Sequence, residues 1–246
     1  MKKCVSPGFT LAEVLITLGI IGVVAAITIP TLIANIQGSR YRNQFKKAIS
    51  TLSQAARMSA TQYNFDYAGV YQRCTNPKTD HPDNIRSVCS LINGTIKGAT
   101  YSRLEDLKTN GTTKKYQIKA ISSIVKEYAN NNWGFPTYTL SDGTLIIIHT
   151  AFGINTPCTK GIGTILKDDY SATLDGLSGC TMLIDVNGTT LPNTEVSCTT
   201  GSNELKDNNI CIVKNKDITD IFPVRVHDGV VEPATPASRY VLQSAK

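Results

Sequence analysis

The chain has 246 residues and a formal net charge of +6, from 25 Lys and Arg against 19 Asp and Glu. This basic excess is too small to indicate nucleic-acid binding by itself. The three histidines lie far apart, and neither a nucleophile-elbow motif nor a complete dinucleotide fingerprint occurs. We therefore predict no enzymatic activity. The length leaves room for one soluble domain beside a membrane-spanning segment.

The most informative stretch lies near the amino terminus. Residues 14–39 carry no charge, and about 20 apolar residues suffice for a helix to cross a hydrocarbon core of ~30 Å. Glu13 stands at the edge of this run, where a charged side chain costs roughly 2.5–3.5 kcal/mol on insertion scales. An ordinary secretory signal explains the stretch poorly, because the apolar run is too long and Glu13 interrupts its beginning. The sequence predicts a membrane-spanning helix whose carboxylate has a function.

A specific pattern covers the first 30 residues. A short basic leader ends at Gly8, the sequence FTLAE follows, and the apolar helix contains Gly22 and Pro30. This pattern resembles the class III signal of type IV pilins and type II secretion pseudopilins. The resemblance implies that a prepilin peptidase cleaves between Gly8 and Phe9 and methylates the Phe9 amine. It further implies that Glu13 pairs with the Phe9 amine of a neighbouring subunit, and we expect a helix kink at Gly22 and Pro30.

This reading divides the chain into three parts. Residues 1–8 are a leader peptide, residues 9–36 a transmembrane and filament-core helix, and residues 37–246 an external, periplasmic domain that includes the second half of the same helix. Basic residues flank the span on both sides, so charge alone leaves the orientation open. The implied location is the bacterial inner membrane, followed by a pilus or pseudopilus. The implied partners are copies of itself or other pilin-like subunits, the prepilin peptidase, an inner-membrane assembly platform and, before assembly, lipid.

Seven cysteines occur, of which Cys4 lies in the leader. The six cysteines that remain are an even number, which fits an oxidising compartment and up to three disulfides. Six cysteines allow 15 pairings, and the sequence does not choose among them. We favour neighbours, since each pair brackets a loop-like segment, and we disfavour zinc because no Cys-x-x-Cys pair exists. The favoured pairs are Cys74 with Cys89, Cys158 with Cys180, and Cys198 with Cys211.

Beyond Pro30 the apolar residues fall at helical spacing as far as Gln62, which predicts one long helix that packs a stripe on the soluble domain. The predicted stripe contains Tyr41, Phe45, Ala48, Ile49, Leu52, Ala55, Ala56 and Ser59, with Arg42 outside it. Residues 63–113 are rich in turn signals and read mainly as loops. A second amphipathic helix is expected over residues 115–130.

The carboxyl half reads as strands. A hairpin is predicted from residues 138–140, a turn at 141–143 and a second strand at 144–150. Further strands are expected at 180–186 and 222–227, and antiparallel pairing follows from the short connections. Residues 232–236 are predicted to be a tail. The alternative is that the chain returns to the sheet at residues 240–242. The expected fold is α+β, with a long helix packed on an antiparallel sheet, as in pilins.

Two weaker signals remain. Asp185, Asn187 and Asp217 lie where some secreted pilin-like subunits hold calcium in carboxyl-terminal loops, although Asn-Gly after a strand is also an ordinary tight turn. A basic patch with one aromatic residue lies along the expected second helix, where a solvated face is a simpler explanation than DNA contact. Its members are Lys114, Lys115, Tyr116, Lys119 and Lys126. We expect no cofactor other than calcium, and nucleic acid is not an expected partner.

The sequence thus favours a structural subunit of a type IV pilus or a type II secretion pseudopilus, polymerised through its amino-terminal helix. The alternative is a minor pilin that acts as a tip adhesin or DNA-binding module. The leader pattern does not distinguish a pilus from a pseudopilus, or a major subunit from a minor one.

Overall fold

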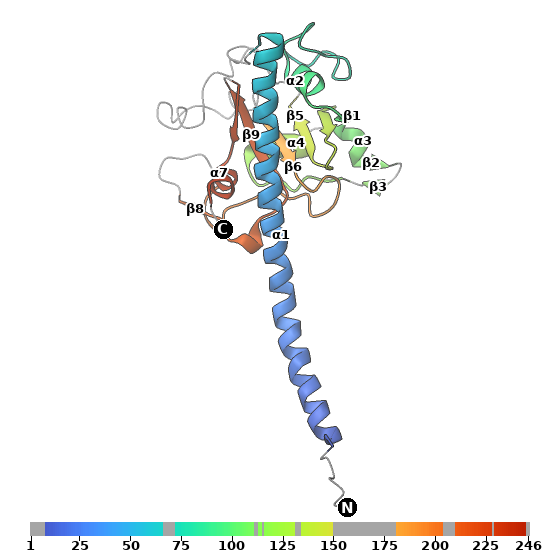
Figure 1. Ribbon diagram of the computed structural model, residues 1–246, viewed down its shortest axis with the longest axis vertical. Coiled ribbons are helices and arrows are strands. Elements are labelled where there is room, and N and C mark those ends of the chain that lie inside the picture. Colours follow the sequence, from blue (N-terminus) through green and yellow to red (C-terminus); the bar gives the residue numbers. More distant parts are fainter. Residues whose placement is uncertain are drawn as a thin grey trace, which may run out of the picture.

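The computed structural model describes residues 8–65, 72–110, 113–114, 116–130, 134–149, 181–203, 210–227 and 229–244. Its dominant element is helix α1 (Leu11–Tyr63), which is 53 residues long and continues through Pro30. Figure 1 shows the carboxyl-terminal half of α1 lying across the sheet, while the amino-terminal half projects away from the domain. Asn64, in the left-handed conformation with φ 51°, ends the helix, as Asn commonly does at a helix C-terminus.

A six-stranded sheet forms the body of the domain, in the order β1-β4-β5-β6-β9-β10, with every neighbouring pair antiparallel. This confirms the predicted α+β fold, the hairpin and both later strands. The strands are β1 (Thr100–Arg103), β4 (Pro136–Thr139), β5 (Leu145–Ile148), β6 (Thr181–Asp185), β9 (Ile221–His227) and β10 (Val230–Pro233). Two small antiparallel pairs lie outside it, β2 (Thr109–Asn110) with β3 (Thr113–Lys114) and β7 (Thr200–Gly201) with β8 (Cys211–Ile212).

Both faces of the sheet are covered, because successive strand residues point to opposite sides. Ile146, Ile184 and Phe222 occupy paired positions on the face toward α1. The Phe45 ring of α1 stacks on Phe222 with ring centroids 4.1 Å apart. The other face packs in a second cluster that includes Leu183. This two-sided burial explains why the central strands are continuous apolar runs.

The second cluster contains residues of the short helix α4 (Ser123–Asn130). The predicted helix over residues 115–130 was therefore right at its end and wrong at its start. Glu195 Oε2 accepts hydrogen bonds from the amides of Ile121 and Ser122, at 2.6 and 2.7 Å. Lys119 forms a parallel bridge with Thr194, which holds the preceding segment extended. A distant carboxylate thus sets the start of the helix, and local periodicity could not show it.

The predicted tail is also wrong, because a strand at residues 230–233 and a helix at residues 236–243 occupy this part of the chain. Strand β10 forms the sheet edge, and helix α7 (Pro236–Gln243) follows it. Thr235 accepts a hydrogen bond from the Ser238 amide and Pro236 occupies the first turn. Thr followed by Pro is a normal helix start. The chain end therefore packs on the domain, where Ala237 and Val241 are fully buried.

The segment expected to be loops contains more structure than predicted. It holds α2 (Val88–Thr95), the edge strand β1 and α3 (Leu104–Lys108). Helix α2 begins with reciprocal hydrogen bonds between Ser87 and Ser90, which is a capping box with serine in place of the usual glutamate. Contact with α1 stabilises this short helix, since eight residues alone would be marginal in water.

Candidate functional site

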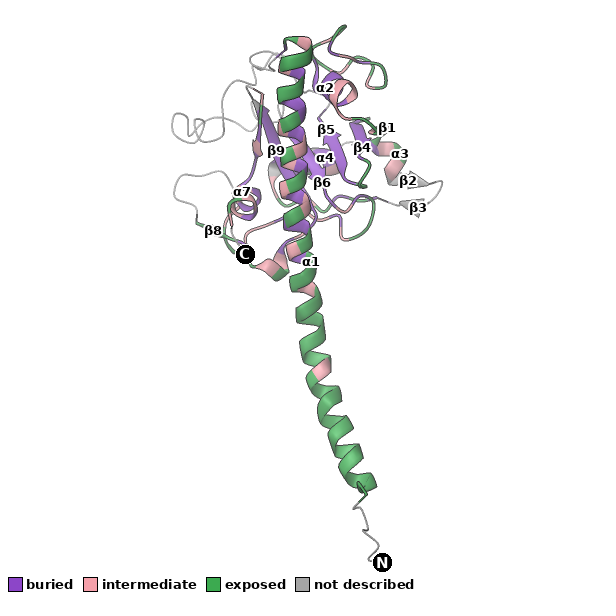
Figure 2. Cartoon of the chain, in the orientation of Figure 1, coloured by how far each residue is buried: buried purple, intermediate pink, exposed green. Residues whose placement is uncertain are grey.

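Helix α1 changes character near Gly38. From Gly38 to Ser59 one face of the helix is buried against the domain, and the predicted stripe is confirmed. Arg42, expected outside the stripe, is buried as well, because the short 3-10 helix η1 (Asn215–Asp217), β10 and α7 also contact α1 and widen its covered face. Almost every residue amino-terminal to Gly38 is exposed, and the projecting half of α1 is accordingly almost entirely green in Figure 2. Helix α1 is long and apolar enough to cross a membrane, by length and composition.

The start of α1 is built by Thr10 and Glu13. The Glu13 carboxylate accepts hydrogen bonds from the Thr10 amide and the Thr10 hydroxyl, each at 2.8 Å, and the Thr10 Oγ1 accepts one from the Glu13 amide at 3.3 Å. This capping box satisfies backbone donors that a helix start leaves open. Phe9, directly before it, is 89% exposed. Phe9 and Glu13 therefore both lie at the uncovered amino-terminal end of α1.

A polar clamp marks the point where α1 enters the domain. Asn215, in the short 3-10 helix η1 (Asn215–Asp217), donates from Nδ2 to the Asn35 carbonyl at 2.6 Å and to Ser39 Oγ at 2.9 Å. A Cβ added at Gly38 would lie 1.7 Å from the Asn215 carbonyl oxygen. Only glycine permits this approach. Sequence reasoning missed the clamp, because its partners lie 176 and 180 residues apart.

Two of the three favoured disulfides are confirmed: Cys74 with Cys89 and Cys198 with Cys211. Cys158 and Cys180 lie outside the described residues. The first bond links the loop before α2 to α2, and the second lies beside the β7–β8 pair. In the chain-entropy model, closing a loop of about 15 residues contributes roughly 3 kcal/mol. The disulfides thus stabilise the loops around the sheet.

Three buried acids that the sequence did not single out for this role organise one end of the sheet. Besides Glu195, Asp220 accepts from the amides of Asn193 and Thr194, both at 2.8 Å, and Asp185 accepts from the Tyr116 hydroxyl at 2.7 Å. All three are fully buried. Burial, and next the charge of Asp220, raises the pKa of Asp185 to about 8. These acids join loops to strands, so their first role is structural.

The three residues predicted for calcium lie in different settings. Asp185 accepts from Tyr116 and from the Asn187 amide, while the Asn187 Nδ2 donates to the carbonyls of Thr190 and Leu191. Asp217 accepts from the Thr199 hydroxyl at 2.7 Å. Asn187 thus stabilises a tight turn after β6, which is the alternative to calcium binding that the sequence left open. Calcium at these residues stays a prediction.

The described residues bring three metal-ligating side chains together at one place. Cys74, Asp80 and Cys89 have ligand atoms within 4.8 Å of one another. Both sulfurs are joined in a disulfide, and Asp80 already accepts from the Thr75 and Asn76 amides, each at 2.9 Å. The disulfide and the Asp80 hydrogen bonds therefore hold the loop before α2 in place.

The predicted basic patch does not lie along a helix. Tyr116 is fully buried with its hydroxyl on Asp185, and Lys119 belongs to the extended bridge with Thr194. Lys126 is on α4, Lys114 is in β3, and Lys115 lies outside the described residues. The interpretation of these residues as one helical face was wrong, because the helix begins only at Ser123. The sheet edge carries a different grouping of cations around an aromatic ring.

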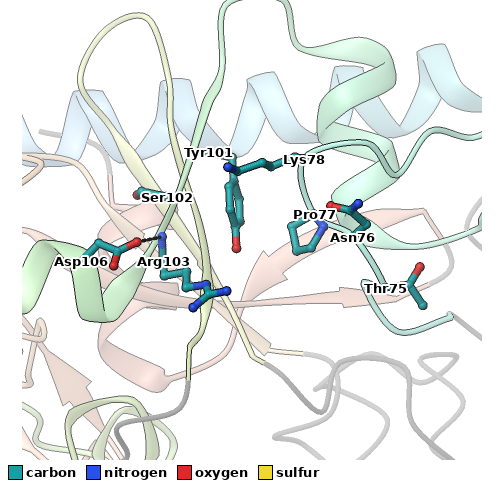
Figure 3. A pocket seen from close by; sticks show the side chains of 8 residues that line it. All are labelled: Thr75, Asn76, Pro77, Lys78, Tyr101, Ser102, Arg103 and Asp106. Atoms are coloured by element: carbon teal, nitrogen blue, oxygen red, sulfur yellow. Dashed lines mark hydrogen bonds between the residues drawn. The ribbon is translucent and has the colours of Figure 1, made fainter.

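That grouping lines a surface cavity of about 480 Å³ between β1 and the loop of residues 75–78. Figure 3 shows the Tyr101 ring standing between Pro77 on one side and Ser102 and Arg103 on the other, with Lys78 reaching over it. Lys78 Nζ lies 6.0 Å from the centre of the Tyr101 ring. No local sequence pattern joins these residues, which come from a loop and an edge strand.

The described histidines have structural surroundings. His149 is buried beside the rings of Tyr128 and Phe135, and burial lowers its pKa to about 4. His81 lies 2.9 Å from the Asp83 carboxylate and contacts Tyr63 edge-on. The absence of enzymatic activity stays a prediction.

Comparison with protein-family models, curated proteins and solved structures finds no match for this chain. The arrangement of helix, sheet and disulfides is the basis for comparing this chain with a known class of proteins. A long amino-terminal apolar helix projects from a domain in which it packs on an antiparallel sheet, and two disulfides staple the loops of that domain. In this general form the chain is pilin-like.

Proposed function

We propose that this chain is a filament subunit of the type IV pilin and pseudopilin class. It is inserted in the bacterial inner membrane with its domain on the periplasmic side, cleaved between Gly8 and Phe9, methylated at Phe9 and polymerised through α1. The observation that carries the proposal is the contrast along α1: an uncovered apolar half beside a half that is packed on the domain. Such an apolar surface requires lipid or other helices around it.

The uncovered half serves two environments in turn. Before assembly, lipid surrounds it, and about 26 helical residues (11–36) exceed the ~20 that a bilayer requires. After extraction, the same side chains pack against the helices of neighbouring subunits. Gly19 and Gly22 face open space in the single chain, and they permit close approach of another helix because glycine has no side chain. The prepilin peptidase and an inner-membrane assembly platform are the partners of these steps.

Glu13 gives the proposal its specific chemistry. A carboxylate among apolar helices is costly unless it is paired. Within one chain it pairs with Thr10, and in the filament it exchanges that partner for the Phe9 amine of a neighbour. The exchange converts a hydrogen-bonded charge into an ion pair inside a low-dielectric core.

The test compares Glu13→Ala with Thr10→Ala. Both variants break the capping box, but only the first removes the carboxylate. If the intersubunit ion pair drives assembly, Glu13→Ala abolishes filaments recovered by shearing while Thr10→Ala retains most of them, and both insert in the membrane. An equal loss of filaments in the two variants would mean that Glu13 acts only as a helix cap. Normal filaments from Glu13→Ala would contradict the intersubunit ion pair.

Processing has its own measurement. Mass spectrometry of the membrane-bound chain should find an N-methylated Phe9 as its first residue, and replacing Gly8 with a bulky residue should leave the leader attached. A mature protein that still begins at Met1 would contradict the whole proposal.

A further inference from the structure

A group of exposed cations lies at the junction where the uncovered half of α1 meets the domain. Asn215 donates to Ser39 Oγ of α1 at 2.9 Å, directly before Arg40. Its neighbours in the sequence, Lys214 and Lys216, flank this contact. All three cations are exposed, and none of them forms an ion pair with another described residue. They are therefore available to a partner outside the chain.

The other basic residues that follow the apolar half on α1 are engaged within the domain. Arg42 is only 8% exposed. Lys46 Nζ donates to a backbone carbonyl just after α7 at 3.0 Å, and Lys47 Nζ lies 2.8 Å from the Asp142 carboxylate. Arg40 differs from these residues, because its side chain stays in solvent.

The acids at this end of the domain offset the positive charge only in part. Asp217, in η1, is half-buried, and its carboxylate accepts a hydrogen bond from the Thr199 hydroxyl at 2.7 Å. Asp185, Glu195 and Asp220 are fully buried, and burial raises the pKa of each. With a pKa of about 8, Asp185 is mostly protonated at neutral pH. Among the described residues of this end, three exposed cations therefore stand against one half-buried carboxylate.

The height of these cations along α1 corresponds to a lipid headgroup layer. The last large exposed apolar residue of the uncovered half is Ile36, at 60% exposure. Arg40 follows four residues later, which is about 6 Å along the helix axis. The headgroup region is roughly 5–8 Å thick on each side of the hydrocarbon core. With α1 inserted as proposed, the junction lies among lipid phosphates (Figure 2).

The contact between η1 and α1 fixes the two lysines at this height. A Cβ added at Gly38 would lie 1.7 Å from the Asn215 carbonyl oxygen, so η1 lies directly against the helix. On its other side, the Lys214 amide donates to Thr199 Oγ1 at 2.9 Å. A backbone held in this way loses little conformational freedom when the lysine side chains meet a partner.

We propose that Arg40, Lys214 and Lys216 form a contact surface for anionic phospholipid headgroups, such as phosphatidylglycerol, in the leaflet on the domain side. This inference rests on the proposed insertion of α1 in a membrane. The three cations need not meet at one phosphate, because the attraction to a charged bilayer surface extends over a Debye length of about 8 Å. Zwitterionic headgroups carry no net charge, so the surface selects anionic lipid. The contact holds the domain close to the bilayer until the subunit is extracted.

The test places the full chain in nanodiscs of phosphatidylcholine alone or with about one-third phosphatidylglycerol of the same acyl chains, and measures hydrogen exchange. We expect the η1 amides to exchange at least about fivefold more slowly in the anionic discs, because one cation near such a surface contributes about this factor. Strand β5, in the centre of the sheet, is the internal reference and should exchange equally in both discs.

Two triple variants separate the junction from charge in general. Arg40→Gln with Lys214→Gln and Lys216→Gln should abolish the difference between the two discs. The matched control neutralises three exposed cations elsewhere on the domain and should retain the difference. Its substitutions are Arg57→Gln, Lys78→Gln and Lys97→Gln. Unchanged exchange in β5 shows that both variants keep the fold, which we expect because all six side chains are exposed.

Three outcomes would overturn the proposal. They are equal η1 exchange of the natural chain in both discs, a difference that survives in the junction variant, and an equal loss in both variants. If the junction variant keeps the lipid effect and loses filaments, these cations serve a contact between subunits instead. Cleavage and filament formation play no part in the exchange measurement, so its failure leaves the filament proposal standing. A chain that does not insert in the discs at all would instead contradict the proposed insertion.

Discussion

The two halves of α1 are one continuous helix with opposite relations to their surroundings. Leu52 and Phe45 in the carboxyl-terminal half are fully buried, whereas Leu15 and Ile20 in the amino-terminal half are 61% and 60% exposed. Hydrophobicity is therefore not what distinguishes a packed segment from an exposed one. The difference teaches that the apolar side chains of the first half pack on no other segment of the described part of the chain, and that their role depends on other molecules.

The largest test of this contrast removes one apolar side chain from each half. Phe45→Ala takes away a ring stacked on Phe222 and should cost about 3–5 kcal/mol of unfolding free energy. Ile20→Ala should leave the domain stability within about 0.5 kcal/mol, because Ile20 lies far outside the domain core. Denaturant unfolding of the full chain in detergent, followed by near-ultraviolet circular dichroism, measures both. Equal losses would mean that the two halves stabilise one folding unit.

A second pair of variants tests where the contrast begins. Gly38→Ala forces a methyl group against the Asn215 carbonyl and should destabilise the domain by about 1–3 kcal/mol. Gly22→Ala is the matched control, since a Cβ there has open space, and it should leave the domain unchanged in unfolding experiments. A neutral Gly38→Ala would show that η1 moves freely along the helix.

A third prediction concerns ionisable side chains. The domain buries several of them, whereas the projecting half of α1 has none after Glu13. Burial raises the pKa of Asp185 from its ordinary value near 3.8 to about 8. The folded state therefore holds a proton that the unfolded state releases, so stability should fall as pH rises from about 4 to 8. Asp185→Asn should flatten this dependence in unfolding measurements at pH 5 and pH 8.

Tyr116→Phe provides the opposite change. The Tyr116 hydroxyl donates to Asp185 and holds its pKa lower than burial alone would. Removing the donor should raise that pKa further and steepen the loss of stability with pH. An unchanged slope in both variants would show that another group carries the pH dependence.

Local signals in the sequence predicted a large part of this fold. The apolar run and the helical stripe predicted α1, and short strand-forming runs bounded by turn signals predicted β4, β5, β6 and β9. These features succeed because hydrophobic periodicity is a property of the segment itself. The disulfides Cys74–Cys89 and Cys198–Cys211 were predicted from proximity along the chain, which is also local information.

The errors have a common physical cause. Glu195 sets the start of α4 from 73 residues away, and Asn215 locks α1 from 180 residues away. The Tyr101 cavity joins an edge strand to a loop that the disulfide and Asp80 hold in place. Each depends on a partner that only the folded chain brings close, so no pattern within one segment reveals it.

The sequence by itself determined that an apolar helix begins the chain, that Glu13 stands at its edge and that an α+β domain follows. Tertiary structure alone decided that α1, within the described part of the chain, is covered only from Gly38 onward, that Asn215 binds α1 at Asn35 and Ser39, and that Lys78 and Arg103 line one cavity beside Tyr101. The reason is that periodicity and composition are properties of residues that are neighbours in the sequence. The burial of α1, its hydrogen bonds to Asn215 and the cavity beside Tyr101 depend on contacts between residues that are distant in the sequence.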